Sequence, residues 1–474
     1  MANEIKADIC VLGAGPAGLS IAAGASQLGA QTVLIERGRM GGDCLNYGCV
    51  PSKSLLAAAK AAHVPAHAGL MGVHYAAPEI DFAAVRDHVQ GVISAIAPQD
   101  SVERYEGLGV TVLRGSARFI NPREVEVGDE RVRARRFVVA TGSTPMIPPI
   151  PGLESVPYLT NETVFDLSDC PGHLIVVGGG PIGCELGQAF ARLGARVSIV
   201  EMASILPRDD PELVDILRAR LRAEGLRLYE GAKVASVAPT GGGVAVAIER
   251  DGGQETLEGT ALLLAAGRKP AVGDLGLEAA GIAYGAGGVK VDRRLRTSNK
   301  RVFAAGDVCG GYQSTHMAGH HAGVVIKNAL FRLPAAVESR AVPWVTYCDP
   351  ELAHVGLDED TARQREGAIR ILRWPFHEND RAQAERRPEG LVKVIATARG
   401  RVLGASVLGA QAGEVIQPWI LAIANKIPLS AMAQMIAPYP TFGEANQRAA
   451  AGYFVEKLFN PRTKWLVRLL SRLG

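Results

Sequence analysis

Two cysteines are the residues of this chain best suited to electron transfer. Cys44 and Cys49 lie in the segment Gly41-Gly-Asp-Cys-Leu-Asn-Tyr-Gly-Cys-Val-Pro-Ser-Lys53. The thiolate is the reactive form of cysteine, and a helix N-terminus or a nearby cation stabilises it. Pro51 and Lys53 favour a helix start beside Cys49, so we expect this sulfur to be the stabilised thiolate.

A metal site and a pair of inert core cysteines are two other interpretations of this spacing. Zinc prefers four Cys or His ligands at matched spacings, and none lie near the pair in the sequence. A buried cysteine often acts only as a small apolar side chain. The pair, however, directly follows a nucleotide-binding pattern. This position favours a dithiol that receives electrons from a nucleotide cofactor.

That pattern occurs twice in the chain. Each copy consists of an apolar strand, Gly-x-Gly-x-x-Gly, a helix, and a second strand that ends in glutamate. Matching residues lie 165 positions apart, from Gly13 and Gly178 (178 − 13) to Glu36 and Glu201 (201 − 36). One copy could arise by chance, but two copies in register predict two dinucleotide-binding units.

Each glycine motif is expected to hold a pyrophosphate at a helix N-terminus. Its glycines allow the turn and the close approach of the backbone, and the helix dipole favours the anion. The closing glutamate accepts hydrogen bonds from ribose hydroxyls. At Glu201 a carboxylate would repel a 2′-phosphate, which favours NADH over NADPH, although Arg196 and Arg208 nearby could favour the phosphate.

Three further segments are expected to complete the nucleotide-binding sheets. Residues 137–145 and 261–270 each read as a buried strand followed by a turn, at Gly142 and Gly267. Residues 302–307 form another apolar strand that ends in Gly-Asp. After about residue 341 the pattern becomes that of an α+β domain. Its predicted strands are 369–376, 390–398 and 402–409, and its predicted helices are 411–425, 429–436 and 444–457.

The composition limits the class of protein. A chain of 474 residues predicts two to four domains, and a net charge of +3 gives no reason to expect nucleic acid. Its 7 cysteines are scattered apart from one pair, which favours a reducing compartment over a secreted disulfide framework. The sequence has no signal peptide and no apolar run that could span a bilayer, so we expect a cytoplasmic location.

These motifs together resemble the class I pyridine nucleotide–disulfide oxidoreductases, which include dihydrolipoamide dehydrogenase, glutathione reductase and mercuric reductase. The resemblance covers essentially the whole chain. It implies an α/β fold with two Rossmann-like dinucleotide-binding domains and a C-terminal α+β dimerisation domain. The implied domains are FAD-binding at 1–150, NAD-binding at 151–275, FAD-binding again at 276–340, and dimerisation at 341–474.

The resemblance also implies roles for single residues. Cys49 matches the cysteine nearest the flavin, and Cys44 matches the interchange thiol that attacks the substrate. Lys53 matches the lysine near the flavin ring, with Glu185 as its partner carboxylate. The residues implied to contact FAD are Gly13, Gly15, Gly18, Glu36, Gly142 and Asp307, and those implied to contact NAD are Gly178, Gly180, Gly183, Glu201 and Gly267.

One position departs from the family pattern. The family signature His-Pro-Thr-x-x-Glu supplies a proton-transferring dyad across the dimer interface, whereas residues 439–444 read Tyr-Pro-Thr-Phe-Gly-Glu. Tyr439 replaces the His and Glu444 is kept. A phenol with an ordinary pKa of about 10 is a poor base at neutral pH. A tyrosine here resembles mercuric reductases, but the sequence has no cysteine after Cys348 to match their C-terminal Cys-Cys pair.

Three functions follow as hypotheses. The first is a homodimeric, dihydrolipoamide dehydrogenase-like enzyme that passes electrons from NADH through FAD and the Cys44–Cys49 disulfide to an acceptor. The second is a mercuric reductase-like enzyme whose acceptor is a thiol-bound metal ion such as Hg(II). The third is a non-catalytic flavin redox sensor. The complete set of Cys44, Cys49, Lys53 and Glu185 favours an enzyme, because a sensor would not need the whole relay.

The remaining candidate residues are assigned to packing. His316 and His320 share a helical face, but packing or flavin contact is favoured over a metal site. His63 and His67 have the same spacing, and Pro65 between them is expected to break the helix. The segment from Arg462 to Leu473 predicts a basic amphipathic helix that packs on the dimer or, less favoured, contacts a membrane surface. The cysteines assigned to packing are Cys10, Cys184, Cys309 and Cys348.

Overall fold

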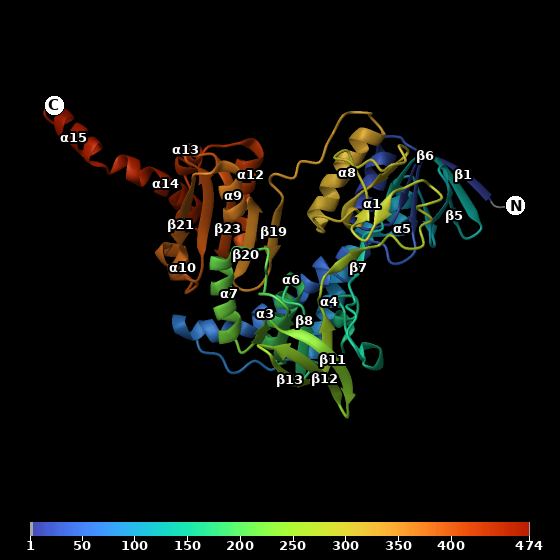
Figure 1. Ribbon diagram of the computed structural model, residues 1–474, viewed down its shortest axis with the longest axis horizontal. Coiled ribbons are helices and arrows are strands. Elements are labelled where there is room, and N and C mark those ends of the chain that lie inside the picture. The colour runs from blue at the N-terminus through green and yellow to red at the C-terminus, as the bar shows by residue number, and fades with distance from the viewer. Residues whose placement is uncertain (1–2, 474) are drawn as a thin grey trace.

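The computed structural model describes residues 3–473. They form three parts, each of which contains a β-sheet (Figure 1). The sheet that contains β1 lies at one side of the molecule, and the C-terminal sheet lies at the other. The part that contains β8 and α6 lies below and between them in this view, together with α3 and α4. The N- and C-terminal ends of the chain point in opposite directions.

The first nucleotide-binding unit is built on the largest sheet of the described residues, which has seven strands in the order β3-β2-β1-β6-β5-β4, with β18 paired to β6. β18 is parallel to β6, so the segment 302–307 returns the chain to this sheet as expected. Helices α1 and α8 cover one face, where Ile21, Val325 and Phe303 share an apolar core. The elements are β1 (Asn3–Leu12), α1 (Pro16–Gln27), β2 (Thr32–Glu36), β3 (Val110–Arg114), β4 (Arg118–Asn121), β5 (Glu124–Val127), β6 (Glu130–Val139), β18 (Val302–Ala304) and α8 (Thr315–Ala329).

The second unit repeats this plan on a smaller scale. Its parallel sheet has the order β10-β9-β8-β14, and a separate antiparallel sheet, β11-β12-β13, covers it. β14 closes the parallel sheet beside β8, as the segment 261–270 predicts. The elements are β8 (His173–Val177), α6 (Pro181–Arg192), β9 (Arg196–Glu201), α7 (Pro211–Ala223), β10 (Arg227–Glu230), β11 (Lys233–Thr240), β12 (Gly243–Arg250), β13 (Gly253–Gly259) and β14 (Ala261–Leu264).

The internal repeat is also a structural repeat at the glycine turns. Gly13 and Gly178 have positive φ values of 106° and 113°. A Cβ added at either position would lie 2.4 Å from a backbone oxygen, that of Ala140 or of Ala265. Only glycine meets both requirements without strain, which explains the residue type at these turns.

The C-terminal part is an antiparallel sheet with helices. Its strand order is β19-β20-β23-β22-β21, and the three predicted strands correspond to β21–β23. The sequence pattern did not reveal β19 and β20, because β20 is buried along nearly its whole length and shows no alternation. The elements are β19 (Pro343–Thr346), β20 (Glu351–Gly356), α9 (Glu359–Glu366), β21 (Ile369–Pro375), β22 (Leu391–Thr397), β23 (Val402–Gly409), α11 (Ala412–Val415), α12 (Gln417–Asn425), α13 (Leu429–Ala433) and α14 (Glu444–Leu458).

Helix α3 (Cys49–Ala68) joins the first unit to the second. Together with α4 (Phe82–Ile96) it shares an apolar core with α6 of the second unit. The expectation that Pro65 breaks the helix is wrong, because α3 continues to Ala68. Pro65 lies in the last turn, where Arg220 Nη2 contacts the Nε2 atoms of His63 and His67 at 3.2 and 2.9 Å. These contacts hold the final turn against α7.

No helix within residues 3–473 combines the length and the apolar character needed to cross a membrane.

Candidate active site

The dithiol lies directly after the first nucleotide-binding motif, where two helices meet. Cys44 is in the short helix α2 (Gly42–Asn46), and Cys49 is the first residue of α3, as predicted. Gly41, with a φ of 87°, allows the turn into α2, and Asn46 Nδ2 donates to the carbonyl oxygens of Met40 and Gly42 at 3.0 and 2.8 Å. Both cysteines are free thiols that hydrogen-bond to one another.

The surroundings of the two sulfurs give Cys44 and Cys49 different pKa values. The hydrogen bond from Cys44 is the largest influence on the pKa of Cys49 and lowers it against the opposing effect of desolvation. The hydroxyl of Thr315, whose Oγ1 lies 3.4 Å from the Cys49 sulfur, and the Lys53 cation lower it further, to about 6. The same hydrogen bond, together with desolvation, raises the pKa of Cys44. At neutral pH the pair is therefore a Cys49 thiolate beside a Cys44 thiol.

Lys53 and Glu185 form the ion pair that the sequence motif suggests. Lys53 lies one turn after Cys49 on α3, and its Nζ is 2.8 Å from Glu185 Oε2 on α6. Desolvation alone would lower the pKa of Lys53, but the Glu185 carboxylate outweighs it and raises the pKa. Tyr347 completes the cluster, because its backbone N–H donates to Glu185 Oε1 at 2.9 Å and its ring centroid lies 4.3 Å from Lys53 Nζ. The Lys53 cation therefore lies one turn from the thiolate. It is held there by Glu185 of the second unit and Tyr347 of the C-terminal part.

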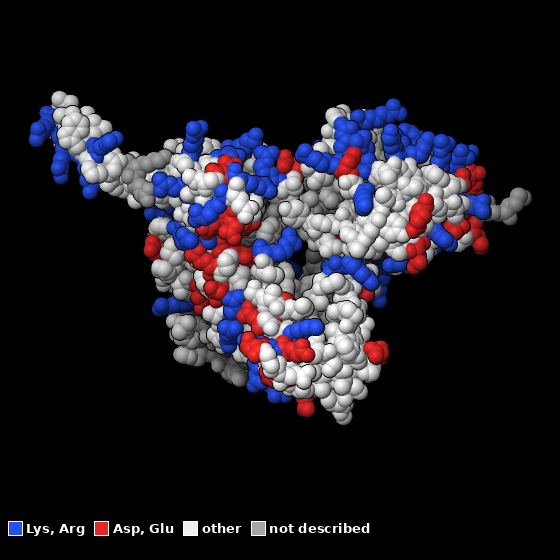
Figure 2. Space-filling view, in the orientation of Figure 1, with Lys and Arg blue, Asp and Glu red and all other residues white. Residues whose placement is uncertain are grey.

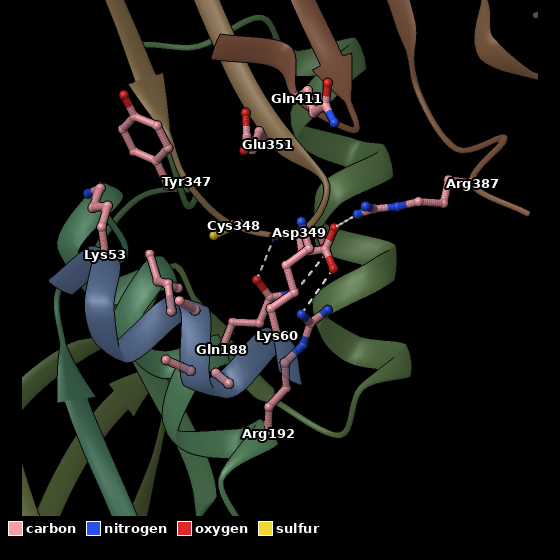
Figure 3. Close-up of a pocket in the computed structure, with 14 residues that line it drawn as sticks. Lys53, Lys60, Gln188, Arg192, Tyr347, Cys348, Asp349, Glu351, Arg387 and Gln411 are labelled. Atoms are coloured by element: carbon pink, nitrogen blue, oxygen red, sulfur yellow. Dashed lines mark hydrogen bonds and ion pairs between the residues drawn. The ribbon is translucent and has the colours of Figure 1, made fainter. Parts of the chain in front are cut away.

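A polar cavity of about 180 Å³ lies where α3, α6 and the loop after β19 meet (Figure 3). Lys53 and Tyr347 lie at one end, and Asp349 at the other end binds Arg192 Nη1 at 3.0 Å and also Arg387. Neither Cys44 nor Cys49 lines the cavity, so it is not the path by which a substrate would reach the dithiol. Cys348 lines it but is 1% exposed, and burial raises the pKa of its thiol.

Both nucleotide motifs leave room for a phosphate at the start of a helix. A Cβ added at Gly15 or Gly180 would meet no atom within 4 Å. The helices α1 and α6 that follow have no side-chain cap, so their first N–H groups are available to an anion. By contrast, a Cβ at Gly18 or Gly183 would lie 1.8 or 1.9 Å from the carbonyl oxygen of Gly13 or Gly178. The second glycine of each motif, Gly15 or Gly180, therefore suits a ligand, and the last one allows the helix to pack on its strand.

The two glutamates at the ends of β2 and β9 make equivalent hydrogen bonds. Glu36 accepts from the backbone N–H groups of Ala14 and Gly38, both at 2.6 Å. Glu201 accepts from those of Gly179 and Ala203 at 2.7 and 2.9 Å. Each carboxylate thus lies at the glycine turn of its own unit. Arg208, which could have met a 2′-phosphate, has its guanidinium carbon 5.6 Å from the ring centroid of Trp344.

Arg268 links the redox loop, which carries Cys44 and Cys49, to the turns that follow β6 and β14 in the two nucleotide units. Its local sequence predicted no role for it. Its Nη2 lies 3.1 Å from Asp43 Oδ1, and its Nε donates to Ser143 Oγ at 2.8 Å. Ser143 in turn donates to Asp307 Oδ2 at 2.7 Å, and burial raises the pKa of this carboxyl group. The turns at Gly142 and Gly267 let β7 (Ser143–Pro145) pair with β15 (Arg268–Pro270), which brings these groups together. The only sequence signal for Arg268 is its place directly after Gly267.

Tyr439 and Glu444 do not meet the dithiol of their own chain. Tyr439 is 67% exposed, and its hydroxyl donates to Asp380 Oδ2 at 2.6 Å, which raises the pKa of the phenol. Glu444 is buried and pairs with Arg448 at 2.8 Å. Both residues belong to the C-terminal part, on the far side of the molecule from β1 (Figure 1).

Of the three histidines of α8, only His321 packs inside the fold, whereas His316 and His320 are exposed. His321 is buried, and its Nδ1 accepts from the Gly306 N–H at 3.1 Å, while His316 Nε2 lies 2.9 Å from the Pro343 carbonyl oxygen. Within residues 3–473, no cluster of three or more His, Cys, Asp or Glu side chains could hold a metal ion.

Comparisons with known proteins agree with this architecture. Residues 7–322 match the model of the pyridine nucleotide-disulphide oxidoreductases, and residues 342–450 match the model of their dimerisation domain. The chain is 34% identical to a mercuric reductase of Bacillus cereus over 440 residues, which is 92% of this chain and 70% of that protein. It is 36% identical to a dihydrolipoyl dehydrogenase of Thermus scotoductus over 455 residues, which is 94% of this chain and 96% of that protein. Among solved structures, a Cu(II) complex of the HOCl-induced flavoprotein disulfide reductase RclA from Escherichia coli matches with a TM-score of 0.84 and 29% identity, over 93% of this chain and 99% of that one.

Proposed function

This chain belongs to the pyridine nucleotide-disulphide oxidoreductase family, and we propose that it is an NADH-linked enzyme whose Cys44–Cys49 pair reduces an acceptor from solution. The family consists of FAD-dependent enzymes that use a pyridine nucleotide. The observation that carries the proposal is the separated acidity of the pair. A Cys49 thiolate lies beside Thr315 and the Lys53 cation, with a Cys44 thiol as its neighbour.

The residues around the first glycine turn suit FAD. The open space at Gly15 and the uncapped start of α1 would take the pyrophosphate, and Glu36 would take the ribose hydroxyls. Bound there, FAD would supply the two-electron carrier between the nicotinamide and the dithiol. Asp307, just after β18, and Lys53 on α3 would face the remaining part of the same cofactor.

NADH is the proposed nucleotide at the second glycine turn. The Glu201 carboxylate lies at this turn, where it would accept from ribose hydroxyls and repel a 2′-phosphate. Arg208, the nearby cation that could reverse this preference, lies over the Trp344 ring. A comparison of kcat/KM for NADH and NADPH tests the proposal, and equal values would contradict it.

The dithiol performs the proposed transfer by thiol–disulfide exchange. Reduction of the Cys44–Cys49 disulfide takes up two electrons and one proton and leaves a Cys44 thiol and a Cys49 thiolate. Cys44 then loses its proton and attacks a sulfur of the acceptor disulfide, which releases one acceptor thiolate and forms a mixed disulfide. Cys49 attacks the Cys44 sulfur, displaces the second acceptor thiolate and restores the original disulfide.

We propose that the enzyme works as a homodimer in a reducing, cytoplasmic compartment. The match to the dimerisation domain supports the dimer. In that assembly, Tyr439 and Glu444 of one subunit would act at the Cys44 thiol of its partner, because they do not contact the dithiol of their own chain. Reducing surroundings suit a chain whose 7 cysteines are scattered apart from one pair.

A thiol-bound metal ion is the second candidate acceptor, and Tyr439 is the observation that favours it. Asp380 raises the pKa of this phenol, so Tyr439 stays protonated at neutral pH and does not take up the proton that Cys44 must lose. A soft metal ion is held by thiolates, and its reduction depends less on proton transfer. A mercuric reductase among the relatives and a Cu(II) complex among the solved structures support this candidate.

Steady-state oxidation of NADH with two acceptors tests the proposal. Lipoamide serves as the disulfide, and Hg(II) in excess thiol serves as the metal acceptor. Either activity should fall to background in Cys44→Ser and should persist in Cys170→Ser, a matched change at a half-buried cysteine of the second unit. Full turnover in Cys44→Ser would contradict the dithiol route, and no turnover with any acceptor would favour the redox sensor.

A further inference from the structure

The last helix of the chain is exposed on all sides. Helix α15 (Pro461–Leu470) continues from α14 and projects away from the C-terminal sheet (Figure 1). None of its side chains is buried, and the exposed fraction is 64% for Trp465 and 53% for Leu470. The match to the dimerisation domain ends at residue 450, before this helix begins. The helix therefore lies outside both the folded body of the chain and the recognised dimerisation domain.

Two kinds of side chain are segregated around α15. Lys464 and Arg468, with Arg472 just beyond the helix, follow a four-residue spacing and form one stripe. The adjoining arc is apolar and consists of Trp465, Leu466, Leu469, Leu470 and Leu473. Arg462 is the exception, because it lies four positions before Leu466 on the apolar side; residues 459–473 contain four cations and no acidic residue. By contrast, α9 of the same domain mixes both signs of charge, as a solvated helix usually does.

The positive charge of α15 has a counterpart elsewhere on the molecule. Figure 2 shows Lys and Arg side chains along the upper edge of the view, over α15 at one end and over the region of α8 and β6 at the other. In the latter region Arg136 lies among like charges. Its pKa is lowered first by burial and then by the Arg135, Arg301 and Arg332 cations. A cluster of cations around Arg136 suits an anionic surface.

We propose that α15 binds the surface of a membrane that contains anionic lipids. Such a surface takes both features of the helix together, because Trp and Leu enter the headgroup boundary while Lys and Arg meet lipid phosphates. The α15 of a second copy of the chain would cover the apolar arc, but that helix has no acidic residue to pair with the cationic stripe. The inner leaflet of the cytoplasmic membrane carries the required negative charge, which agrees with the proposed compartment.

Cosedimentation with vesicles tests this proposal on the full-length holoenzyme. Vesicles of phosphatidylcholine alone are compared with vesicles that also contain phosphatidylglycerol. We expect the protein to pellet with the anionic vesicles, to stay in solution with the neutral ones, and to be released by salt. Equal binding to the anionic and the neutral vesicles, or no binding to either kind, would overturn the proposal.

Three variants separate the contributions of the two faces. Removing the stripe (Lys464→Gln, Arg468→Gln, Arg472→Gln) should weaken binding about fivefold per cation. Removing apolar area (Trp465→Ala, Leu469→Ala) should also weaken binding at constant charge. The control removes three exposed cations from the second nucleotide unit (Arg227→Gln, Lys233→Gln, Arg250→Gln) and should bind as the parent does.

Two readouts keep these results interpretable. NADH oxidation should be unchanged in all three variants, which shows that the fold is intact. The dimer mass in light scattering should also be unchanged if the helix binds lipid. The Trp465→Ala, Leu469→Ala variant could lose the dimer while the parent protein fails to bind vesicles. That outcome would show that the helix contacts a second copy of the chain, and it would overturn the proposal. Equal loss of binding in the control variant would overturn it as well.

Discussion

The acidity of Cys49 depends on three single residues around its sulfur. Cys44, Thr315 and Lys53 each lower the pKa of this thiol, which reaches about 6. The thiolate is therefore present at neutral pH and is lost as the pH falls through about 6. In the proposed mechanism, this separation would let Cys49 face the flavin as an anion while Cys44 carries the proton.

The contact with Thr315 can be tested by a pH titration. In the two-electron-reduced enzyme, the long-wavelength charge-transfer absorbance of the thiolate should be half-lost near pH 6. Thr315→Val removes the hydroxyl and should shift this midpoint upward by about one unit, or about 1.4 kcal/mol. Thr315→Ser keeps a donor and should retain the parent midpoint. A downward shift in the valine variant would contradict the assigned role.

The ion pair between Lys53 and Glu185 can be tested by stability. Lys53→Gln leaves the Glu185 side chain, which is 7% exposed, without its cation. Because the Lys53 side chain is 38% exposed, the loss should be about 1–2 kcal/mol, below the value for a fully buried pair. Urea unfolding measures it, and the double change with Glu185→Gln should recover part of the loss. Equal stability of the single variant and the parent would show that the pair contributes little.

The sequence predicts residues that carry their own motif and misses residues that arrive by tertiary packing. Cys44 and Cys49 follow from a local pattern with known chemistry, and the pairing of Lys53 with Glu185 follows from the resemblance to the family. Thr315 lies 266 positions from Cys49 and meets it only because α8 and α3 converge. Arg268 and Tyr347 were missed for the same reason, since nothing in their local sequence signals a contact with the redox loop.

At the scale of elements, the repeat is the feature that the sequence predicts best. A period of 165 residues with fixed spacing determines both glycine turns and both glutamate contacts. Strand β20 lacks a usable pattern, because burial of its four central residues removes the alternation that marks a strand. The helix through Pro65 was also missed, since its support comes from Arg220 on another element.

Alanine substitutions at two glycines of the second motif should have different effects, one on NADH binding and the other on stability. Gly180→Ala adds a methyl group to open space, at a backbone φ of −72° that any residue adopts, so the protein should fold normally. The methyl group would occupy the phosphate position, and the Kd for NADH should rise about tenfold or more. Gly183→Ala places its methyl group 1.9 Å from the Gly178 carbonyl oxygen and should destabilise the unit by about 1–3 kcal/mol.

Calorimetric binding of NADH and thermal unfolding of the two glycine variants distinguish these outcomes. Normal NADH affinity in a stable Gly180→Ala protein would show that the nucleotide does not bind at the start of α6. Unchanged stability in Gly183→Ala would show that the helix can move away from its strand.

At the scale of the whole molecule, the proposed active site needs two chains. Tyr439 and Glu444 lie on the C-terminal part, and the dithiol lies where α2 and α3 leave the first unit (Figure 1). Subunit exchange tests this arrangement. Cys44→Ser homodimers and Tyr439→Ala, Glu444→Ala homodimers should both be impaired with a disulfide acceptor.

A mixture of these two variants should regain about a quarter of the parent activity, because half of the random dimers carry one complete site of two. Turnover with lipoamide measures the recovery, and mixing after the subunits are crosslinked serves as the control. No recovery on mixing would place the acceptor site within a single chain.

The central claim is that electrons leave the nucleotide cofactors through the Cys44–Cys49 pair. Anaerobic titration of the purified flavoprotein with NADH tests it most directly. We predict that a long-wavelength charge-transfer band develops in the parent, persists in Cys44→Ser and is absent in Cys49→Ala, because only Cys49 is held as the thiolate. A band that survives in Cys49→Ala, or that never forms in the parent, would contradict the account.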